Sequence, residues 1–154
     1  MKDVMWVLQN CIEGRIIVSG GQDINVYRLN TVEAYDHVVD SWSYMPNMIE
    51  RRAGHKSVAI RSKLFVVGEL DINCEVFDST CKQFVYIKKL PPRSFLRFEK
   101  KCPTEIVSIG SQIAVFAPDR EILFYDVDND EWSEKSCDAT KDLELFACSK
   151  VRQV

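Results

Sequence analysis

A short pattern occurs three times in this chain of 154 residues: an aromatic residue, an aspartate, five further residues and a second bulky aromatic. The copies read "YDHVVDSW" (35–42), "FDSTCKQF" (77–84) and "YDVDNDEW" (125–132). Their aspartates, at positions 36, 78 and 126, are 42 and 48 residues apart. A unit that recurs at this spacing predicts a repeat architecture, in which each unit is one small structural element that stacks on its neighbours.

An apolar run precedes each copy of the pattern. The runs are "RIIVSGG" (15–21), "KLFVVGE" (63–69) and "QIAVFAP" (112–118). The first ends in two glycines, which predicts a strand that enters a turn requiring positive φ or a close approach of backbone. The alternation in "TVEAYD" (31–36) predicts a further strand with two unlike faces, and "WSYMP" (42–46) predicts a short strand that ends at the proline.

A strand ahead of each apolar run, such as "HKSVAI" (55–60), brings the number of strands in a unit to four. The sequence shows no helical periodicity of useful length. Because one small sheet cannot bury both of its faces alone, four-stranded units of this kind stack side by side as the blades of a β-propeller.

The glycine pair, the aromatic residue and the later tryptophan resemble the kelch repeat. The first copy matches this pattern in full, at Gly20, Gly21, Tyr35 and Trp42. The second copy keeps Gly68, Phe77 and Phe84 but has Glu69 in place of the second glycine. The third keeps Tyr125 and Trp132 but has Ala117 and Pro118 in place of both glycines. The resemblance covers residues 5–135.

The resemblance predicts an all-β fold: a partial kelch β-propeller of three four-stranded antiparallel blades with an extra C-terminal strand. The blades are expected at about 5–46, 55–90 and 104–135 of a single domain, 1–154, and "KDLELFACSKV" (141–151) as the start of a fourth blade. A closed kelch propeller usually has six blades. We therefore expect the chain to be a fragment of a longer protein, an incomplete gene model or half of an assembly.

The resemblance also implies that the repeated aromatic residues pack between adjacent blades, so Trp42 and Trp132 are expected to be largely buried. The aspartate of each copy is expected to begin the turn between the third and fourth strands. Such residues define the fold and say almost nothing about a ligand.

Partner-binding residues are predicted in the segment that joins the first two blades, "MPNMIERRAGHKSVAI" (45–60). In proteins that carry BTB and kelch domains, an arginine here often lies at one mouth of the propeller and contacts acidic groups. Arg52 matches this position best, with Arg51 beside it; the alternative is an exposed arginine or one paired with Glu50. The segment after blade two, "LPPRSFLRFEKKC" (90–102), offers Arg93 and Arg97, although Phe95 and Phe98 depart from the pattern.

Charge and composition give no indication of a nucleic acid or a membrane as partner. The formal net charge is -3, the isoelectric point is about 5.4, and no apolar stretch approaches the roughly 18 residues of a membrane span. The N-terminus lacks the apolar core of a signal peptide, so we expect a cytoplasmic protein with its six cysteines as buried thiols.

No cofactor or metal site is expected. The cysteines lack CxxC spacing, and the only histidines are His37 and His55. The segment "DVDNDEW" (126–132) resembles the start of a calcium loop, but Glu131 stands where such a loop needs glycine and Cys137 where it needs glutamate.

We therefore expect a protein-interaction module and not an enzyme. The resemblance implies the substrate-recruiting part of a cullin-type ubiquitin ligase adaptor, with an actin-binding cytoskeletal protein as the alternative. A kelch-fold oxidase is the third reading, and it would require a tyrosine and two histidine ligands around a complete axis. Three blades would also leave an apolar sheet face open at each end, which predicts self-association through these faces.

Overall fold

The computed structural model describes residues 8–68, 73–91, 105–116 and 121–136, and all the regular elements in these ranges are β-strands. Blade 1 consists of β1 (Leu8–Ile12), β2 (Arg15–Ser19), β3 (Val32–Asp36) and β4 (Ser41–Met45). Blade 2 consists of β5 (Lys56–Ile60), β6 (Lys63–Val67), β7 (Cys74–Asp78) and β8 (Gln83–Ile87). Blade 3 consists of β9 (Glu105–Ile109), β10 (Gln112–Phe116), β11 (Glu121–Asp126) and β12 (Glu131–Ser136).

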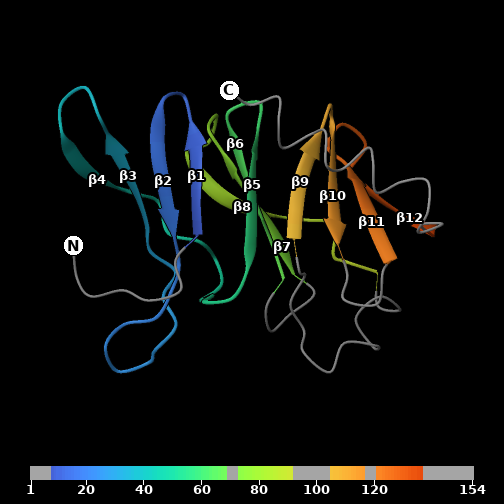
Figure 1. Cartoon of the computed structure of the whole chain (residues 1–154), viewed down its shortest axis with the longest axis horizontal. Coiled ribbons are helices and arrows are strands. Elements are labelled where there is room, and N and C mark those ends of the chain that lie inside the picture. Colours follow the sequence, from blue (N-terminus) through green and yellow to red (C-terminus); the bar gives the residue numbers. More distant parts are fainter. Residues whose placement is uncertain (1–7, 69–72, 92–104, 117–120, 137–154) are drawn as a thin grey trace.

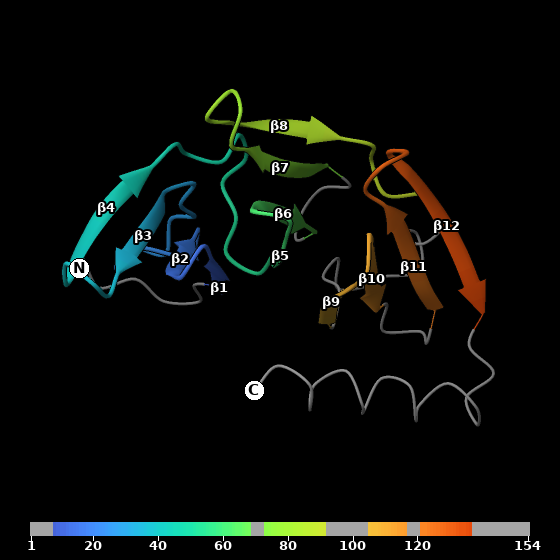
Figure 2. The same cartoon turned by 90° about the horizontal axis from the view of Figure 1, so that it is seen from above.

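Each blade is an antiparallel sheet whose four strands follow one another in chain order. The three sheets fan out in an arc, with β1, β5 and β9 nearest the centre and β4, β8 and β12 on the outside (Figures 1 and 2). The predicted all-β fold of three four-stranded antiparallel blades is confirmed, and the three apolar runs form the equivalent strands β2, β6 and β10. The predicted C-terminal strand (141–151) lies outside the described residues.

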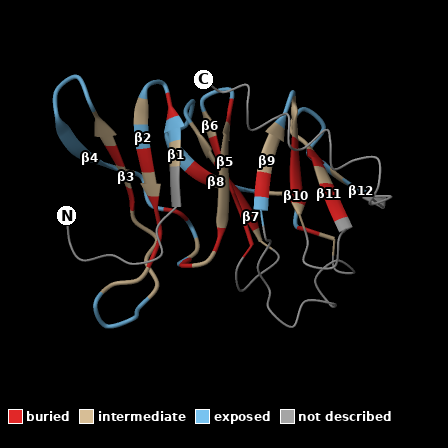
Figure 3. Cartoon of the chain, viewed as in Figure 1, coloured by how far each residue is buried: buried red, intermediate tan, exposed pale blue. Residues whose placement is uncertain are grey.

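The hydrophobic core lies between the blades. The cluster between blades 1 and 2 consists of Ile12, Ile17, Val32, Ala34, Met48, Leu64, Val66 and Phe84. The cluster between blades 2 and 3 consists of Ile60, Phe65, Val67, Cys74, Val76, Leu90, Ile106, Ile113, Val115, Leu123 and Tyr125. Successive side chains of a strand point to opposite faces, so blade 2 contributes to both clusters. Burial is concentrated in these strands, whereas β4 is exposed along most of its length (Figure 3).

The repeated pattern forms the same hairpin in all three blades. Asp36, Asp78 and Asp126 each accept a hydrogen bond from the backbone N–H two residues later, at 2.9, 2.8 and 2.9 Å. The residue four positions after each aspartate has positive φ, and the two aromatic residues lie directly opposite each other with ring centroids 5.2, 5.5 and 4.9 Å apart. The Thr80 N–H lowers the pKa of Asp78, and the Asn129 N–H, which donates to Asp126 Oδ1 at 3.0 Å, lowers that of Asp126, since such donors favour the ionised carboxylate.

Gly20 lies at the point where β2 enters the connection to β3. Its φ is 61°, and a Cβ atom there would lie 2.5 Å from the Arg52 carbonyl oxygen and 2.6 Å from His55 Cε1. The glycine thus allows the segment after blade 1 to pack directly against the backbone, where Gly21 N–H donates to Arg52 O at 2.8 Å.

We expect Gly20→Ala to destabilise the chain by about 2–4 kcal/mol, because it adds a steric clash with backbone to the cost of a left-handed alanine. Gly110→Ala is the matched control: its φ is 60°, yet no atom lies within 4 Å of the added carbon. The control should cost only about 1 kcal/mol. Urea denaturation followed by circular dichroism measures both, and equal losses would contradict the close approach at Gly20.

The interface between blades 2 and 3 includes a pair of hydrogen bonds to the backbone of one residue, Lys88. Trp132 Nε1 donates to Lys88 O at 2.8 Å, and Lys88 N–H donates to Asp130 Oδ1 at 2.9 Å. Asp130 Oδ1 also accepts the Tyr125 hydroxyl at 2.7 Å. Burial, followed by this bond to Asp130, raises the pKa of Tyr125. The aromatic pairs of blades 2 and 3 therefore face the preceding blade.

The prediction that Trp42 is largely buried is wrong for this chain, because its side chain is 42% exposed. Trp132 is partly buried and packs against the core between blades 2 and 3. The difference follows from position, since the face that carries Trp42 would meet a blade before blade 1, and the described residues contain no such blade.

Trp132→Ala should lower the free energy of unfolding by about 3 kcal/mol, because it removes ring packing and the bond to Lys88. Trp42→Ala should cost about 1 kcal/mol when the chain is monomeric, because its ring is half exposed. Urea denaturation at low protein concentration compares the two. A loss for Trp42→Ala equal to that for Trp132→Ala would show that Trp42 is covered in the isolated chain.

Three cysteines lie in the described part of the chain, and all three are free thiols. Only Cys74 is buried, and burial raises the pKa of its thiol to about 12; Cys11 and Cys81 are exposed, contrary to the expectation of buried thiols. Among the described residues, no helix has the length and apolarity required to cross a membrane.

Candidate partner-binding surface

The structure places Arg52 in the interior, between blades 1 and 2. Its side chain is 3% exposed, and its Nε donates to Glu75 Oε1 at 2.9 Å. Its two terminal nitrogens donate to the carbonyl oxygens of Gly68, at 2.5 Å, and Asn73, at 2.9 Å. The prediction that Arg52 contacts a partner does not fit this burial, and its ionic partner is Glu75 and not Glu50.

Glu75 completes the same network. It is fully buried, and its carboxylate accepts the backbone N–H groups of Ile49 at 2.7 Å and Glu50 at 3.2 Å. The segment that follows blade 1 is therefore held against β7 of blade 2 by this charged pair. Buried charges of this kind require both an ionic partner and hydrogen bonds to the remaining polar atoms, and the network supplies both.

Arg52→Ala should destabilise the chain by about 3–5 kcal/mol, because it leaves the Glu75 carboxylate buried without its cation. Arg51→Ala, one residue earlier and exposed, should change stability by less than about 0.5 kcal/mol. Chemical denaturation of both variants checks this difference. If the two substitutions were equally mild, Arg52 would not be part of the scaffold.

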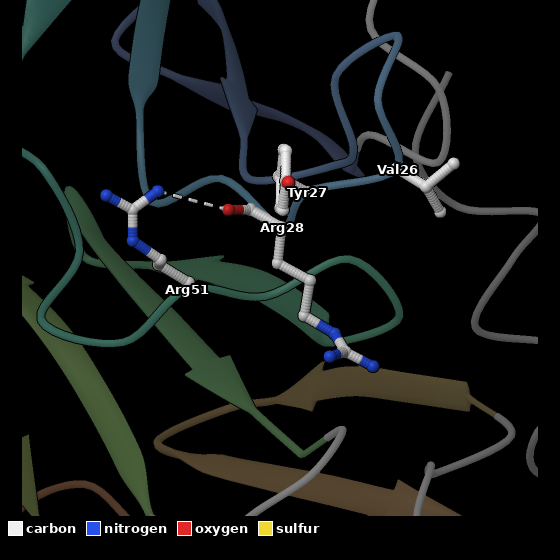
Figure 4. A pocket seen from close by; sticks show the side chains of 4 residues that line it. All are labelled: Val26, Tyr27, Arg28 and Arg51. Atoms are coloured by element: carbon white, nitrogen blue, oxygen red, sulfur yellow. Dashed lines mark hydrogen bonds between the residues drawn. The ribbon is translucent and has the colours of Figure 1, made fainter.

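Arg51 lies on the surface, beside the connection between β2 and β3. Its Nη1 donates to Arg28 O at 3.2 Å (Figure 4). Together with Val26, Tyr27 and Arg28, it lines a shallow pocket of about 490 Å³. The two arginine side chains extend in different directions (Figure 4), so two cationic groups line the same pocket as the Val26 and Tyr27 side chains.

We name residues 22–28 the recognition loop; it forms part of the connection between β2 and β3. Asp23 Oδ1 accepts the backbone N–H groups of Asn25 and Tyr27, both at 2.9 Å, which fixes the loop from within. Three large apolar side chains nevertheless face solvent: Ile24 is 79%, Val26 66% and Tyr27 69% exposed. Val26 also has φ of 66°, which a β-branched residue rarely adopts. A strained loop that exposes apolar side chains is typical of a recognition element.

Reasoning from sequence did not identify this loop as a site. The feature of the sequence that could have identified the loop is its length. The segment "QDINVYRLN" (22–30) is the longest of the connections between the glycine run and the repeated aromatic pair. The two other predicted site residues, Arg93 and Arg97, lie outside the described residues.

The histidines do not form a reactive centre with other described side chains. His55 Nε2 and Ser19 Oγ are 3.0 Å apart, but both side chains are 1% exposed, so this pair is closed to a substrate. His37 lies in an exposed hairpin, where its Nδ1 is 3.1 Å from Gly14 O. In the described part of the chain, no three His, Cys, Asp or Glu side chains are grouped so that they could hold a metal ion.

Comparison with known proteins agrees with the geometry of the blades. Residues 10–49 match the Kelch motif family. Kelch-like protein 7 of Rattus norvegicus is 28% identical over 128 residues, which cover 75% of this chain and 20% of that protein. The Kelch repeat-containing protein kel-10 of Caenorhabditis elegans is 39% identical over 56 residues, which cover 36% of this chain and 10% of that protein.

The fold has a counterpart among solved structures. The structure of YjhT superimposes with a TM-score of 0.68 and 14% sequence identity, over 89% of this chain and 53% of that one. Three four-stranded blades in an arc thus define the class of the protein as a partial β-propeller. Residues 10–49 carry a kelch motif, and the chain spans about a fifth of the length of Kelch-like protein 7, to which it is similar.

Proposed function

We propose that the chain binds a protein partner through the recognition loop and Arg51. The observation that carries this proposal is the exposure of three large apolar side chains on a loop that is fixed by its own hydrogen bonds. A loop held in one conformation loses little entropy on binding, and exposed tyrosine and arginine side chains are the residue types most common at the centres of interfaces.

The chemistry of the surface suggests the chemistry of its partner. Tyr27 and Val26 offer an apolar contact, and Arg51 lies at the border of the same pocket. A guanidinium group favours carboxylate or phosphate groups, because its planar fork binds two oxygens at once. The partner segment therefore combines an apolar side chain with an acidic group.

The biological role that fits best is recruitment of a substrate for a cullin-type ubiquitin ligase in the cytoplasm. The match to Kelch-like protein 7 supports this role, since it extends over 75% of this chain at 28% identity. Within this role the propeller selects the substrate, and a separate domain engages the ligase. No catalytic role is proposed for any residue.

We expect Tyr27→Ser to reduce binding of the partner at least about tenfold, because it removes the largest exposed side chain of the recognition loop. Val39→Ser is the matched control. Val39 is 66% exposed, close to the 69% of Tyr27, but it lies in the hairpin at the opposite end of blade 1 (Figure 1). The measurement is affinity capture from cells with quantitative mass spectrometry, using the wild-type chain and both variants.

A protein that is retained by the wild-type chain and by Val39→Ser but lost with Tyr27→Ser is the partner of this loop. Its half-life should lengthen when cullin ligases are inhibited, if recruitment to a ligase is its role. Equal capture by Tyr27→Ser and Val39→Ser would contradict the proposed site.

Cosedimentation with filamentous actin tests the alternative, a cytoskeletal role. Saturable binding to filaments that Tyr27→Ser abolishes and Val39→Ser preserves would favour the actin-binding reading over substrate recruitment.

A further inference from the structure

The segment that joins blade 1 to blade 2 carries an acid and a base as neighbours in sequence, Glu50 and Arg51. The structure directs their side chains to different partners. Glu50 Oε1 accepts the hydroxyl of Tyr86 at 2.6 Å, whereas Arg51 Nη1 donates to Arg28 O at 3.2 Å. Tyr86 belongs to β8 of blade 2, and Arg28 belongs to the connection between β2 and β3 of blade 1. Two opposite charges that are adjacent in the chain are thus held by different blades.

Blade 2 fixes both the backbone and the side chain of Glu50. Tyr86 lies directly opposite Glu75 in the ladder of β7 and β8, so the two side chains lie on one face of the blade. Glu75 accepts the backbone N–H of Glu50 at 3.2 Å and that of Ile49 at 2.7 Å. The Tyr86 hydroxyl then binds the side-chain carboxylate of Glu50. The direction in which this carboxylate points is therefore set by a pair of neighbours on β7 and β8.

The bond between Tyr86 and Glu50 has the length of a strong one. Hydroxyl groups that donate to an ionised carboxylate do so at roughly 2.5–2.7 Å, and such bonds are stronger than those between neutral groups. The bond to Glu50 raises the pKa of Tyr86 to about 12. The hydroxyl therefore stays protonated at neutral pH and continues to donate to the carboxylate.

Arg51 is left open by this arrangement. The bond to Arg28 O occupies one of the several donor N–H groups of its guanidinium. Within the described ranges, the arginines that form ion pairs are Arg15, Arg52 and Arg61, so Arg51 is not among them. Arg51 is exposed and lines the same pocket as Tyr27. Its remaining donors are available to an acidic group.

Glu50 would compete for these donors if it were released from Tyr86. It is joined to Arg51 by one peptide bond, so its carboxylate is present at a high effective concentration. An exposed ion pair of this kind changes an equilibrium by up to about fivefold. A pair between Glu50 and Arg51 would therefore weaken the binding of an external carboxylate by a similar factor.

We propose that Tyr86 is a positioning residue of the binding surface, which holds the Glu50 carboxylate and so keeps Arg51 open to an acidic group of a partner. The part of Arg51 in partner binding rests on the proposed function, but the state of its guanidinium can be measured without a partner. In this arrangement a residue of blade 2 controls the charge of a surface that lies beside the recognition loop of blade 1.

The rate at which Arg51 reacts with phenylglyoxal tests the proposal in the full chain. A guanidinium paired with a carboxylate reacts more slowly, because pairing favours its charged form and covers its nitrogens. Tyr86→Phe should slow the modification of Arg51 about two- to fivefold, since it releases Glu50. Tandem mass spectrometry separates Arg51 from the buried Arg52. Arg61, which is exposed and paired with Asp128 at 2.6 Å, is the internal reference, and its rate should not change.

Two further variants show whether the released carboxylate is the cause. Tyr86→Phe combined with Glu50→Gln should restore the wild-type rate, because the competing charge is gone. Tyr44→Phe is the matched control: Tyr44 has the same register position in blade 1, opposite Glu33, and is 78% exposed. This control should leave the rate of Arg51 unchanged, and circular dichroism confirms that all variants are folded. An unchanged rate in Tyr86→Phe, or a slower rate that Glu50→Gln does not reverse, overturns the proposal.

Affinity capture separates this inference from the proposed function. The proteins that Tyr27→Ser loses should also be captured less by Tyr86→Phe, and the addition of Glu50→Gln should restore them. If Arg51→Ala captured these proteins as well as the wild-type chain does, the proposed function of Arg51 would fail, whereas the phenylglyoxal rates would still decide what Tyr86 does to its guanidinium. If Arg51→Ala reduced capture and Tyr86→Phe did not, the positioning role of Tyr86 would be wrong and the proposed function would stand.

Discussion

Every part of this structure depends on face-to-face packing of four-stranded sheets. A sheet of this size has two broad faces, and neither side can be left in water without losing the burial that stabilises it. Blade 2 has a neighbour on both sides, and the residues it buries toward each of them form two separate cores. Within the described residues, blades 1 and 3 each pack against one neighbouring blade. Stability in such an array is therefore highest in the middle and falls toward the ends.

Polar groups give this apolar stack its register. The aspartate of each repeat fixes the hairpin between the third and fourth strands, and a positive φ four residues later closes it. The hairpin in turn sets the position of the second aromatic residue against the preceding blade. A second polar interaction, the buried ion pair of Arg52 and Glu75, holds the segment between blades 1 and 2 against β7. Hydrophobic contact provides the driving force, and these few hydrogen bonds select one arrangement.

The sequence predicted the blades well, because residues such as Asp36 and Gly20 are required by backbone geometry wherever the same hairpin or turn occurs. It did not predict the role of Arg52. The local sequence around an arginine in a connecting segment does not show whether the side chain faces solvent or a buried carboxylate, here that of Glu75, 23 residues later. It also placed Trp42 in the core, because the repeat pattern describes a position in a ring and does not say whether the neighbouring blade is present. The recognition loop was missed for a related reason: exposure of Val26 and Tyr27 is set by the loop conformation, which no periodicity encodes.

The contact of Glu75 with the segment around Ile49 has a consequence for synthesis of the chain on the ribosome. Blade 1 ends at Met45, but the segment that follows it receives its buried anion only when β7 has been translated and has paired with β6. Until then Arg52 has no buried carboxylate with which to form an ion pair, so the segment that follows blade 1 remains solvated. The segment after blade 1 can therefore take its final position only after β7 has been synthesised.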